Sequence, residues 1–290
     1  MSISDKFSSF CSNLRMSENT ISNVRTRYHS IIKRLNKDFR DLDSDCFYGL
    51  YVGSYGRGTA IHVSDIDILY IMPPEHYTKY DSYYSNGQSA LLQDVKKSIA
   101  KTFWNTELRG DGQVVKVSFS DGVVFEVVPC FELNDGSFYY PDTHNGGSWK
   151  ITKPRSEIKA INDLNNITNK NLKKLCRMIR AWKDYCNVPM GGLLIDTFAY
   201  RFLKDWEYKD KSYLYYDWMT RDFFKYLSEQ NDNQSYWLAV GSNQYIYSKG
   251  KFTEKARTAY NNALNAIKYE EQNNERMANY YWREIYGRKF

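Results

Sequence analysis

Two aspartates, Asp65 and Asp67, are the residues whose types and spacing point most directly to chemistry. They open an apolar run, Ile66–Met72, that is typical of a β-strand. Side chains two positions apart on a strand point to the same face of the sheet, so the two carboxylates would lie together. Their repulsion costs stability unless a cation lies between them. Mg²⁺ is the expected cation, because it takes oxygen ligands and shares them with phosphate groups.

A glycine-rich segment lies just upstream of these acids. Gly53 and Ser54 follow the short apolar run Leu50–Val52, so the sequence predicts a strand, a glycine-rich turn and a second strand. Glycine lets backbone N–H groups approach a phosphate closely, and a serine hydroxyl adds another donor. An ordinary hairpin with polar turn residues would explain either feature alone. The two features together, eleven positions apart, are far more specific.

A third carboxylate, Glu126, interrupts the apolar run Val123–Val128. That run and the preceding one, Gln113–Phe119, are joined at Asp121-Gly122, which is a signal for a β-hairpin. A carboxylate in so apolar a strand is costly unless it is paired or bound to a metal ion. A structural salt bridge or an outward-facing position is the alternative, because Lys116 interrupts its own strand in the same way.

These segments together resemble the nucleotidyltransferase superfamily of the polymerase-beta type. The residues that match it one by one are Gly53, Ser54, Asp65 and Asp67. Glu126 occupies the position of the family's third metal carboxylate, where Asp is more frequent. The resemblance implies that Gly53 and Ser54 bind the triphosphate, and that two ions of Mg²⁺ or Mn²⁺ are held by the three acids. One ion would activate a 3′- or 2′-hydroxyl of the acceptor, and the other would stabilise the leaving pyrophosphate.

Further segments narrow the resemblance to one branch, the cyclic GMP–AMP synthase/DncV-like nucleotidyltransferases (CD-NTases, with a SMODS catalytic domain) of bacterial anti-phage defence. They are Phe125–Phe131, the helical stretch Leu175–Trp182 with Leu194–Leu203, and a final alanine-rich helix that ends at Trp282–Gly287. The resemblance implies an enzyme that joins NTPs, with ATP and GTP as candidate substrates, into a cyclic di- or trinucleotide second messenger. Pyrophosphate would be released, and the product would activate a downstream effector.

Two other functions stay open at this point. One is a linear oligonucleotide synthase of the 2′-5′ oligoadenylate type. The other is a catalytically dead relative that binds nucleotide or RNA, which the intact acidic trio disfavours. The sequence does not reveal which bases are used.

Four more residues are assigned to nucleotide binding by the resemblance. Arg180 stands where many relatives have a lysine that faces the triphosphate, and Lys183 is its neighbour. Asp196 and Thr197 lie where relatives contact a nucleotide through a serine. A solvated helix face is the alternative for Arg180 and Lys183. Tyr55 is a candidate for stacking on a base, in a chain with 26 Tyr and 7 Trp.

The elements expected around these residues form an α+β fold. Apolar residues at three- and four-residue steps predict helices over 17–39, 89–105, 171–186, 193–203, 217–230 and 253–277. Residues 75–88 and 134–149 are polar and predict loops. We expect three parts, an N-terminal spine helix (1–42), a nucleotidyltransferase core with a mixed sheet and flanking helices (43–150), and a helical C-terminal lobe (151–290). The two lobes would enclose a central active-site cleft.

Composition limits the remaining possibilities. The net charge of +6 over 290 residues suits NTP substrates and does not demand a nucleic acid. The five cysteines are scattered without a C-x-x-C pair, so neither zinc nor a disulfide framework is expected. The polar start lacks a signal core, and no run approaches the ~20 apolar residues of a membrane span. We therefore expect a cytoplasmic monomer with no membrane partner.

Overall fold

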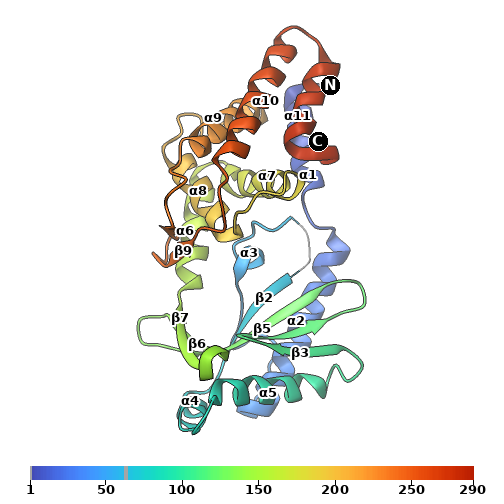
Figure 1. Ribbon diagram of the computed structural model, residues 1–290. Helices are drawn as coiled ribbons and strands as arrows, with labels where there is room; N and C mark the ends of the chain where they lie inside the picture. Colours follow the sequence, from blue (N-terminus) through green and yellow to red (C-terminus); the bar gives the residue numbers. More distant parts are fainter. Residues whose placement is uncertain (1, 62–64) are drawn as a thin grey trace. The chain divides into compact units, whose positions relative to one another are not determined.

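The structure is a computed structural model that describes residues 2–61 and 65–290 (Figure 1). Part of the glycine-rich segment before Asp65, namely residues 62–64, lies outside the described residues. The chain divides into two compact units. Unit 1 holds the chain up to Arg15, a short segment from Gly58, and Ser156–Phe290. Unit 2 holds Met16–Arg57 and the stretch from β2 (Asp65–Ile71) to Arg155. A central cleft stays a prediction.

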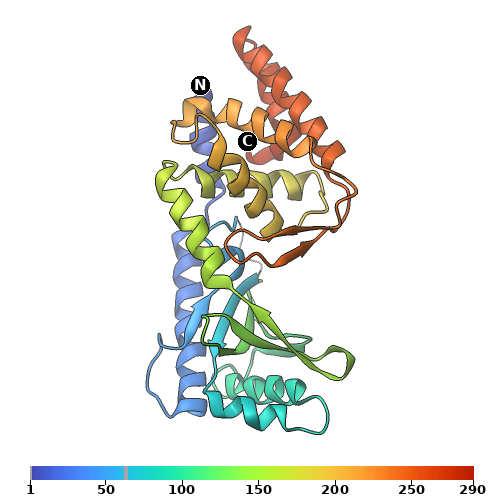
Figure 2. The ribbon, with the colours of Figure 1, turned by 90° about the vertical axis from the view of Figure 1, so that its left-hand side faces the viewer.

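A seven-stranded mixed sheet forms the centre of unit 2 (Figures 1 and 2). The main path runs β1-β2-β5-β4-β3, while β6 pairs with β5 and β7 pairs with β6. Only the β2–β5 pair is parallel among these described pairs. The mixed sheet of an α+β fold is thereby confirmed. Besides β2, its strands are β1 (Gly49–Tyr51), β3 (Glu107–Asp111), β4 (Val114–Ser118), β5 (Val124–Glu132), β6 (Phe138–Asp142) and β7 (Ser148–Thr152).

Helices cover one face of this sheet, as both ribbon views show. They are α2 (Glu18–Arg40), α4 (Pro74–Asp81) and α5 (Gly87–Ala100). Ile66, Ile68 and Tyr70 of β2 are fully buried in the same core as the apolar stripes of α2 and α5. Because side chains alternate along a strand, the odd-numbered residues of β2 face away from these helices.

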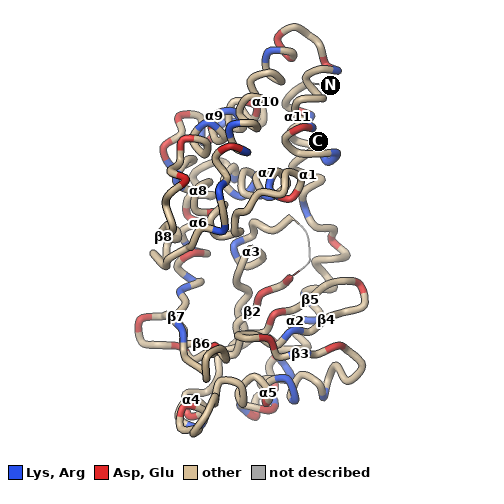
Figure 3. Tube along the Cα trace, viewed as in Figure 1, with Lys and Arg blue, Asp and Glu red and all other residues tan. Residues whose placement is uncertain are grey.

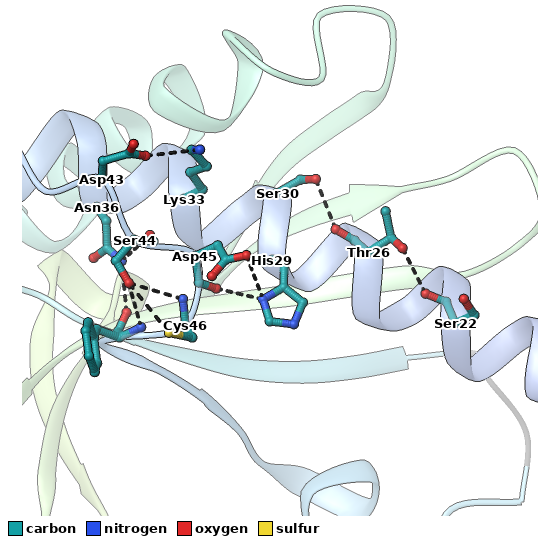
Figure 4. Close-up of polar contacts among 11 residues, drawn as sticks. Ser22, Thr26, His29, Ser30, Lys33, Asn36, Asp43, Ser44, Asp45 and Cys46 are labelled. Atoms are coloured by element: carbon teal, nitrogen blue, oxygen red, sulfur yellow. Dashed lines mark hydrogen bonds and ion pairs between the residues drawn. The ribbon is translucent and has the colours of Figure 1, made fainter.

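The long helix α2 also holds the segment that leads into β1. Ser17 caps its start by accepting a hydrogen bond from the Thr20 amide at 3.1 Å. Near its end the Asn36 amide group donates to the carbonyls of Ser44 and Phe47, both at 2.9 Å. Figure 4 shows this contact together with the pairs Lys33–Asp43 and His29–Asp45, which also connect α2 to the segment that follows it.

Unit 1 is mainly helical. Its core gathers Phe7, Trp182, Phe223 and Trp282, which are fully buried. The predicted helical character of the second half of the chain is confirmed. Its helices are α1 (Ile3–Asn13), most of α6 (Pro154–Ile167), α7 (Asn171–Tyr185), α8 (Gly192–Asp205), α9 (Tyr216–Ser228), α10 (Thr253–Glu271) and α11 (Glu275–Tyr286). Unit 1 also contains a two-stranded antiparallel sheet of β8 (Tyr236–Leu238) and β9 (Tyr245–Tyr247). Short 3₁₀ turns are η1 (His144–Gly146, in unit 2), η2 (Tyr213–Tyr215) and η3 (Gly287–Lys289).

Several local predictions are wrong. The expected loop over 75–88 contains α4, because Pro74 suits the first turn of a helix. The expected loop over 134–149 contains β6 and the start of β7. The single helix over 253–277 is broken between α10 and α11, where Asn273 has a positive φ of 56°. The predicted turn after Val52 begins with the short helix α3 (Gly53–Gly56).

Among residues 2–61 and 65–290, none of the helices combines the length and the apolar character that crossing a membrane demands.

Candidate active site

The three predicted carboxylates share one face of the sheet in unit 2. The parallel pairing of β2 and β5 places Asp67 directly beside Glu126 in register. Phe125 and Val127 of β5 are buried in the helix-side core, so Glu126 points to the opposite face. Asp65 and Asp67 point to that same face, and Figure 3 shows acidic positions where β2 begins and on β5. The prediction that the acids lie on adjacent strands is confirmed.

The electrostatics of this face centre on Asp67. Burial, followed by the neighbouring carboxylates of Glu126 and Asp65, raises the pKa of Asp67 from 3.8 to about 6. The positive charge of Arg57 opposes this shift. The protein therefore holds negative charges close together in a place where water solvates them poorly. A cation bound between the carboxylates would offset both their lost solvation and their mutual repulsion.

Gly53 brings the predicted phosphate-binding segment against the acidic pair. Its φ is +61°, and a Cβ atom at this position would overlap the carboxylate of Asp67. The amide of Val52 donates to the backbone carbonyl of Asp67 at 2.9 Å, which fixes the approach. Only glycine fits so close a contact with this backbone conformation. Ser54 follows in the first turn of α3, so the serine and the acids belong to one local structure.

The sequence did not single out Lys116 as part of this site. Lys116 pairs in register with Glu126 across β4 and β5, and its Nζ lies 3.4 Å from Glu126 Oε1. The same Nζ lies 2.7 Å from Asp111 Oδ2. The available signal was a lone lysine within the apolar run of β4. A metal ion bound by Glu126 would therefore compete with an existing ion pair.

The donor set fits a magnesium or manganese site in its chemistry. Three carboxylates on one sheet face supply only oxygen ligands, which these ions prefer. Within the described residues, however, no three His, Cys, Asp or Glu side chains are already gathered closely enough to ligate one ion. The side chains of Asp65, Asp67 and Glu126 would have to turn toward a common ion. The fit thus rests on the donor set and on the pKa of Asp67.

Arg180 and Asp196 form a buried pair in unit 1. Arg180 Nη1 lies 2.5 Å from Asp196 Oδ1, and Nη2 lies 2.9 Å from Oδ2. Asp196 is fully buried and also accepts from the Thr59 hydroxyl at 2.9 Å. Burial alone would lower the pKa of Arg180, but the Asp196 carboxylate raises it. This placement favours a structural role for both residues, so their contact with a nucleotide stays a prediction.

The other two residues assigned to nucleotide binding lie in the same unit. Thr197 is fully buried, and its hydroxyl accepts from the Val240 amide at 3.2 Å. Lys183 is partly exposed at the end of α7, with its Nζ 3.0 Å from Asp184 Oδ1. Thr197 therefore lacks the exposed surface that a nucleotide contact needs in this conformation, whereas Lys183 has it. Both assignments to nucleotide binding stay predictions.

Comparison with known proteins identifies the family. Residues 1–165, more than half of the chain, match the family model described as the Second Messenger Oligonucleotide or Dinucleotide Synthetase domain, SMODS. The chain belongs to this family. A curated relative from Bacillus cereus strain VD146, named as a probable cyclic nucleotide synthase, is 24% identical over 279 residues. That match covers 82% of this chain and 80% of the relative.

Solved structures share the fold at low identity. CdnC of E. coli MS115-1 with ATP superposes with a TM-score of 0.69 at 17% identity, covering 94% of this chain and 92% of that one. CdnG of Bradyrhizobium diazoefficiens with GTP gives 0.69 at 9% identity, covering 97% and 94%. DncV of Vibrio cholerae gives 0.61 at 15% identity, covering 83% and 68%. The resemblance to CD-NTases and their fold is confirmed, and family and fold support nucleotidyltransferase activity.

Proposed function

We propose that this SMODS-family chain is a divalent-metal-dependent nucleotidyltransferase that joins NTPs into a cyclic di- or trinucleotide. The observation that carries the proposal is the contact of Gly53 with Asp67, beside Glu126 in register on the parallel strand. One segment that can approach a triphosphate and three carboxylates that can hold ions thus meet at one end of β2. The names of the structural neighbours, with ATP and GTP, support these nucleotides as the first substrates to test.

In the proposed reaction the acidic residues and the Gly53-Ser54 segment have different roles. Bound ions held by Asp65, Asp67 and Glu126 would supply charge neutralisation at the reacting phosphate and lower the pKa of the attacking hydroxyl. The backbone at Gly53 and the hydroxyl of Ser54 orient the β- and γ-phosphates, so that pyrophosphate leaves in line with attack at the α-phosphorus. Positioning of this kind accounts for much of the rate in phosphoryl transfer. Near neutral pH most Asp67 side chains are ionised, since the pKa is about 6.

The biological setting is also part of the proposal. The product would act as a second messenger for a downstream effector in anti-phage signalling, as the resemblance to CD-NTases implies. The enzyme would work in the cytoplasm as a monomer, without a nucleic acid or membrane partner.

A product assay tests the proposal. The purified chain is incubated with α-³²P-labelled NTPs and Mg²⁺ or Mn²⁺, and the products are treated with phosphatase. A phosphatase-resistant product supports cyclisation, and a sensitive product indicates a linear oligonucleotide synthase instead. Absence of any product would favour a nucleotide-binding relative without catalysis. Leaving out one NTP at a time identifies the bases, and Asp67→Asn serves as the inactive control.

A further inference from the structure

A basic cavity of about 410 Å³ opens in unit 1. Helix α7 and its N-cap contribute Lys170, Lys173, Lys174 and Arg177 to its wall, at the spacing of one helix face. Figure 3 shows basic positions along α7. None of the residues proposed for catalysis or nucleotide binding lines this cavity.

Helix α1 and the residues just after it supply another part of the lining, with the same periodicity. Ser8, Ser12 and Arg15 recur at steps of three to four residues along and just beyond this helix. Two hydroxyl groups and a guanidinium thus line the cavity together with four cationic side chains. Cys11 lies between them, and burial raises the pKa of its thiol to about 12, so it stays neutral.

Among the described residues that line the cavity, the positive charge is not balanced by acidic side chains. No described residue of the lining carries a carboxylate. None of the five cations forms an ion pair with an acidic side chain in the described ranges. Lys174 lies 4.4 Å from the centre of the Tyr213 ring, and Arg177 donates to the Gly58 carbonyl at 2.7 Å. These contacts orient two cations without neutralising them.

The arrangement is unfavourable in the absence of a ligand. Burial, and next the charge of Arg177, lowers the pKa of Lys173. Burial, and next the charge of Arg15, lowers the pKa of Arg177. Like charges three and four positions apart on a helix repel each other. Cations in the first turn of α7 also oppose the helix dipole. A bound anion would offset the burial of these cations, their mutual repulsion and the unfavourable interaction with the helix dipole.

We propose that this cavity binds a small oligophosphate, either a free polyphosphate chain or the phosphate chain of a nucleotide. Its volume lies in the range of small-molecule pockets. An extended nucleic acid backbone would instead be expected to follow an open basic surface. The cations of α7 and Arg15 would contact the phosphate oxygens, and Ser8 and Ser12 would donate hydrogen bonds. Binding would tie α1 to the start of α7.

Calorimetric titration of the full chain with inorganic tripolyphosphate tests this site. The titration is run in excess EDTA, so that binding through metal ions is suppressed. The double variant Arg15→Gln/Lys174→Gln should weaken binding at least tenfold, and higher salt should weaken wild-type binding steeply. The control is Lys225→Gln, an exposed lysine of α9 outside the cavity, which should bind as the wild type does. Arg15→Gln alone, at an exposed position, provides a second variant if the double variant melts early.

A parallel titration with ADP separates the two sources of the phosphate chain. Tighter binding of ADP than of tripolyphosphate, lost in the same variants, assigns the site to a nucleotide, and the reverse order assigns it to polyphosphate. The proposal is overturned if the wild type binds neither probe, or if the double variant binds as well as the wild type. It is also overturned if only a 20-base-pair DNA or RNA duplex binds through these residues. Calorimetry measures binding and needs no catalytic turnover, so the test of this cavity is independent of whether the chain is an active synthase.

Discussion

At the scale of single residues, the raised pKa of Asp67 links the candidate site to stability. Its ordinary pKa is 3.8 and its folded value is about 6, so the folded protein binds this proton more tightly than the unfolded chain. The stability that goes with this proton is present below pH ~4 and is lost as the pH rises through about 6. At neutral pH the ionised carboxylate therefore destabilises the metal-free fold, by on the order of 3 kcal/mol.

Asp67→Asn should consequently remove activity while leaving the metal-free fold as stable as the wild type or slightly more stable. Asparagine keeps the shape of the side chain but loses the charge that repels Glu126 and would hold an ion. The difference in melting temperature, variant minus wild type, should grow between pH 4 and pH 7 and then level off. Taking the difference cancels the other titrating groups, including Asp217, whose pKa burial also raises to about 6.

Two measurements complete this test. The melts are repeated with Mg²⁺ and a non-hydrolysable NTP analogue, which should stabilise the wild type and not the variant. Asp222→Asn, at an acid of α9 in unit 1, is the control for a charge removed elsewhere and should retain product formation. An Asp67→Asn protein that melts several degrees lower yet still makes product would mean that the acidic pair is scaffold.

Arg180 gives the second prediction at this scale. Arg180→Ala would remove both guanidinium contacts of the fully buried Asp196 carboxylate. Removing one partner of a buried ion pair costs about 3 to 5 kcal/mol, so the variant should unfold at much lower urea. Lys183→Ala on the same helix is the matched control and should change stability little, because its ion pair is exposed to solvent. A stable Arg180→Ala protein with a raised KM for NTP would instead support the triphosphate contact.

At the scale of elements, the features that could be predicted from the sequence are those set by local patterns, such as strand alternation and turn residues. The alternation along β2 and β5 and the Asp-Gly turn before β5 place the three acids on one sheet face. The close approach of Gly53 to Asp67 is also local, because both residues lie in the short stretch from Gly53 to β2. The Arg180–Asp196 pair is different, since it joins the side chains of two helices, α7 and α8, that no strand alternation or turn signal brings together. Only tertiary packing decides whether a charged side chain meets such a partner or water.

The elements that were missed have similar causes. β6 and β7 carry polar and aromatic residues typical of a loop, and they become strands because each has a neighbour to pair with. The break between α10 and α11 lies at a polar stretch without glycine or proline, and Asn273 there adopts a positive φ. Propensity alone does not distinguish such a stretch from the surface of a continuous helix.

Asn36 of α2 provides the prediction for this scale. Its fully buried amide donates to two carbonyls before β1, and its Oδ1 accepts from the Tyr70 hydroxyl of β2 at 3.2 Å. Asn36→Ala removes the hydrogen-bond partner of the buried Tyr70 hydroxyl and of the two carbonyls, which should cost about 2 to 4 kcal/mol of unfolding free energy. Asn23→Ala, at an exposed position of the same helix, should be neutral or slightly stabilising, because alanine favours helix. Equal stability of the two variants in urea would contradict this role of Asn36.

At the scale of the whole molecule, neither unit is a continuous piece of chain. Unit 1 takes the N-terminal helix α1, a segment around Gly58 and the C-terminal half, so the chain passes between the units four times. Unfolding of one unit would release chain segments that the other unit holds fixed at their ends. This interleaving favours a single cooperative transition over two independent ones.

Buried thiols in both units allow that expectation to be tested. Cys130 of unit 2 and Cys176 of unit 1 are fully buried, and burial raises the pKa of the Cys130 thiol, so both should resist alkylation in the native state. Brief labelling at increasing urea, followed by mass spectrometry, should give one midpoint for both thiols. The variant Cys46→Ser/Cys186→Ser removes the exposed and half-exposed thiols that react without unfolding. If Cys130 becomes reactive at clearly lower urea than Cys176, the unit that bears the carboxylates opens on its own. The four chain connections between the units would then be too flexible to make the two units unfold together.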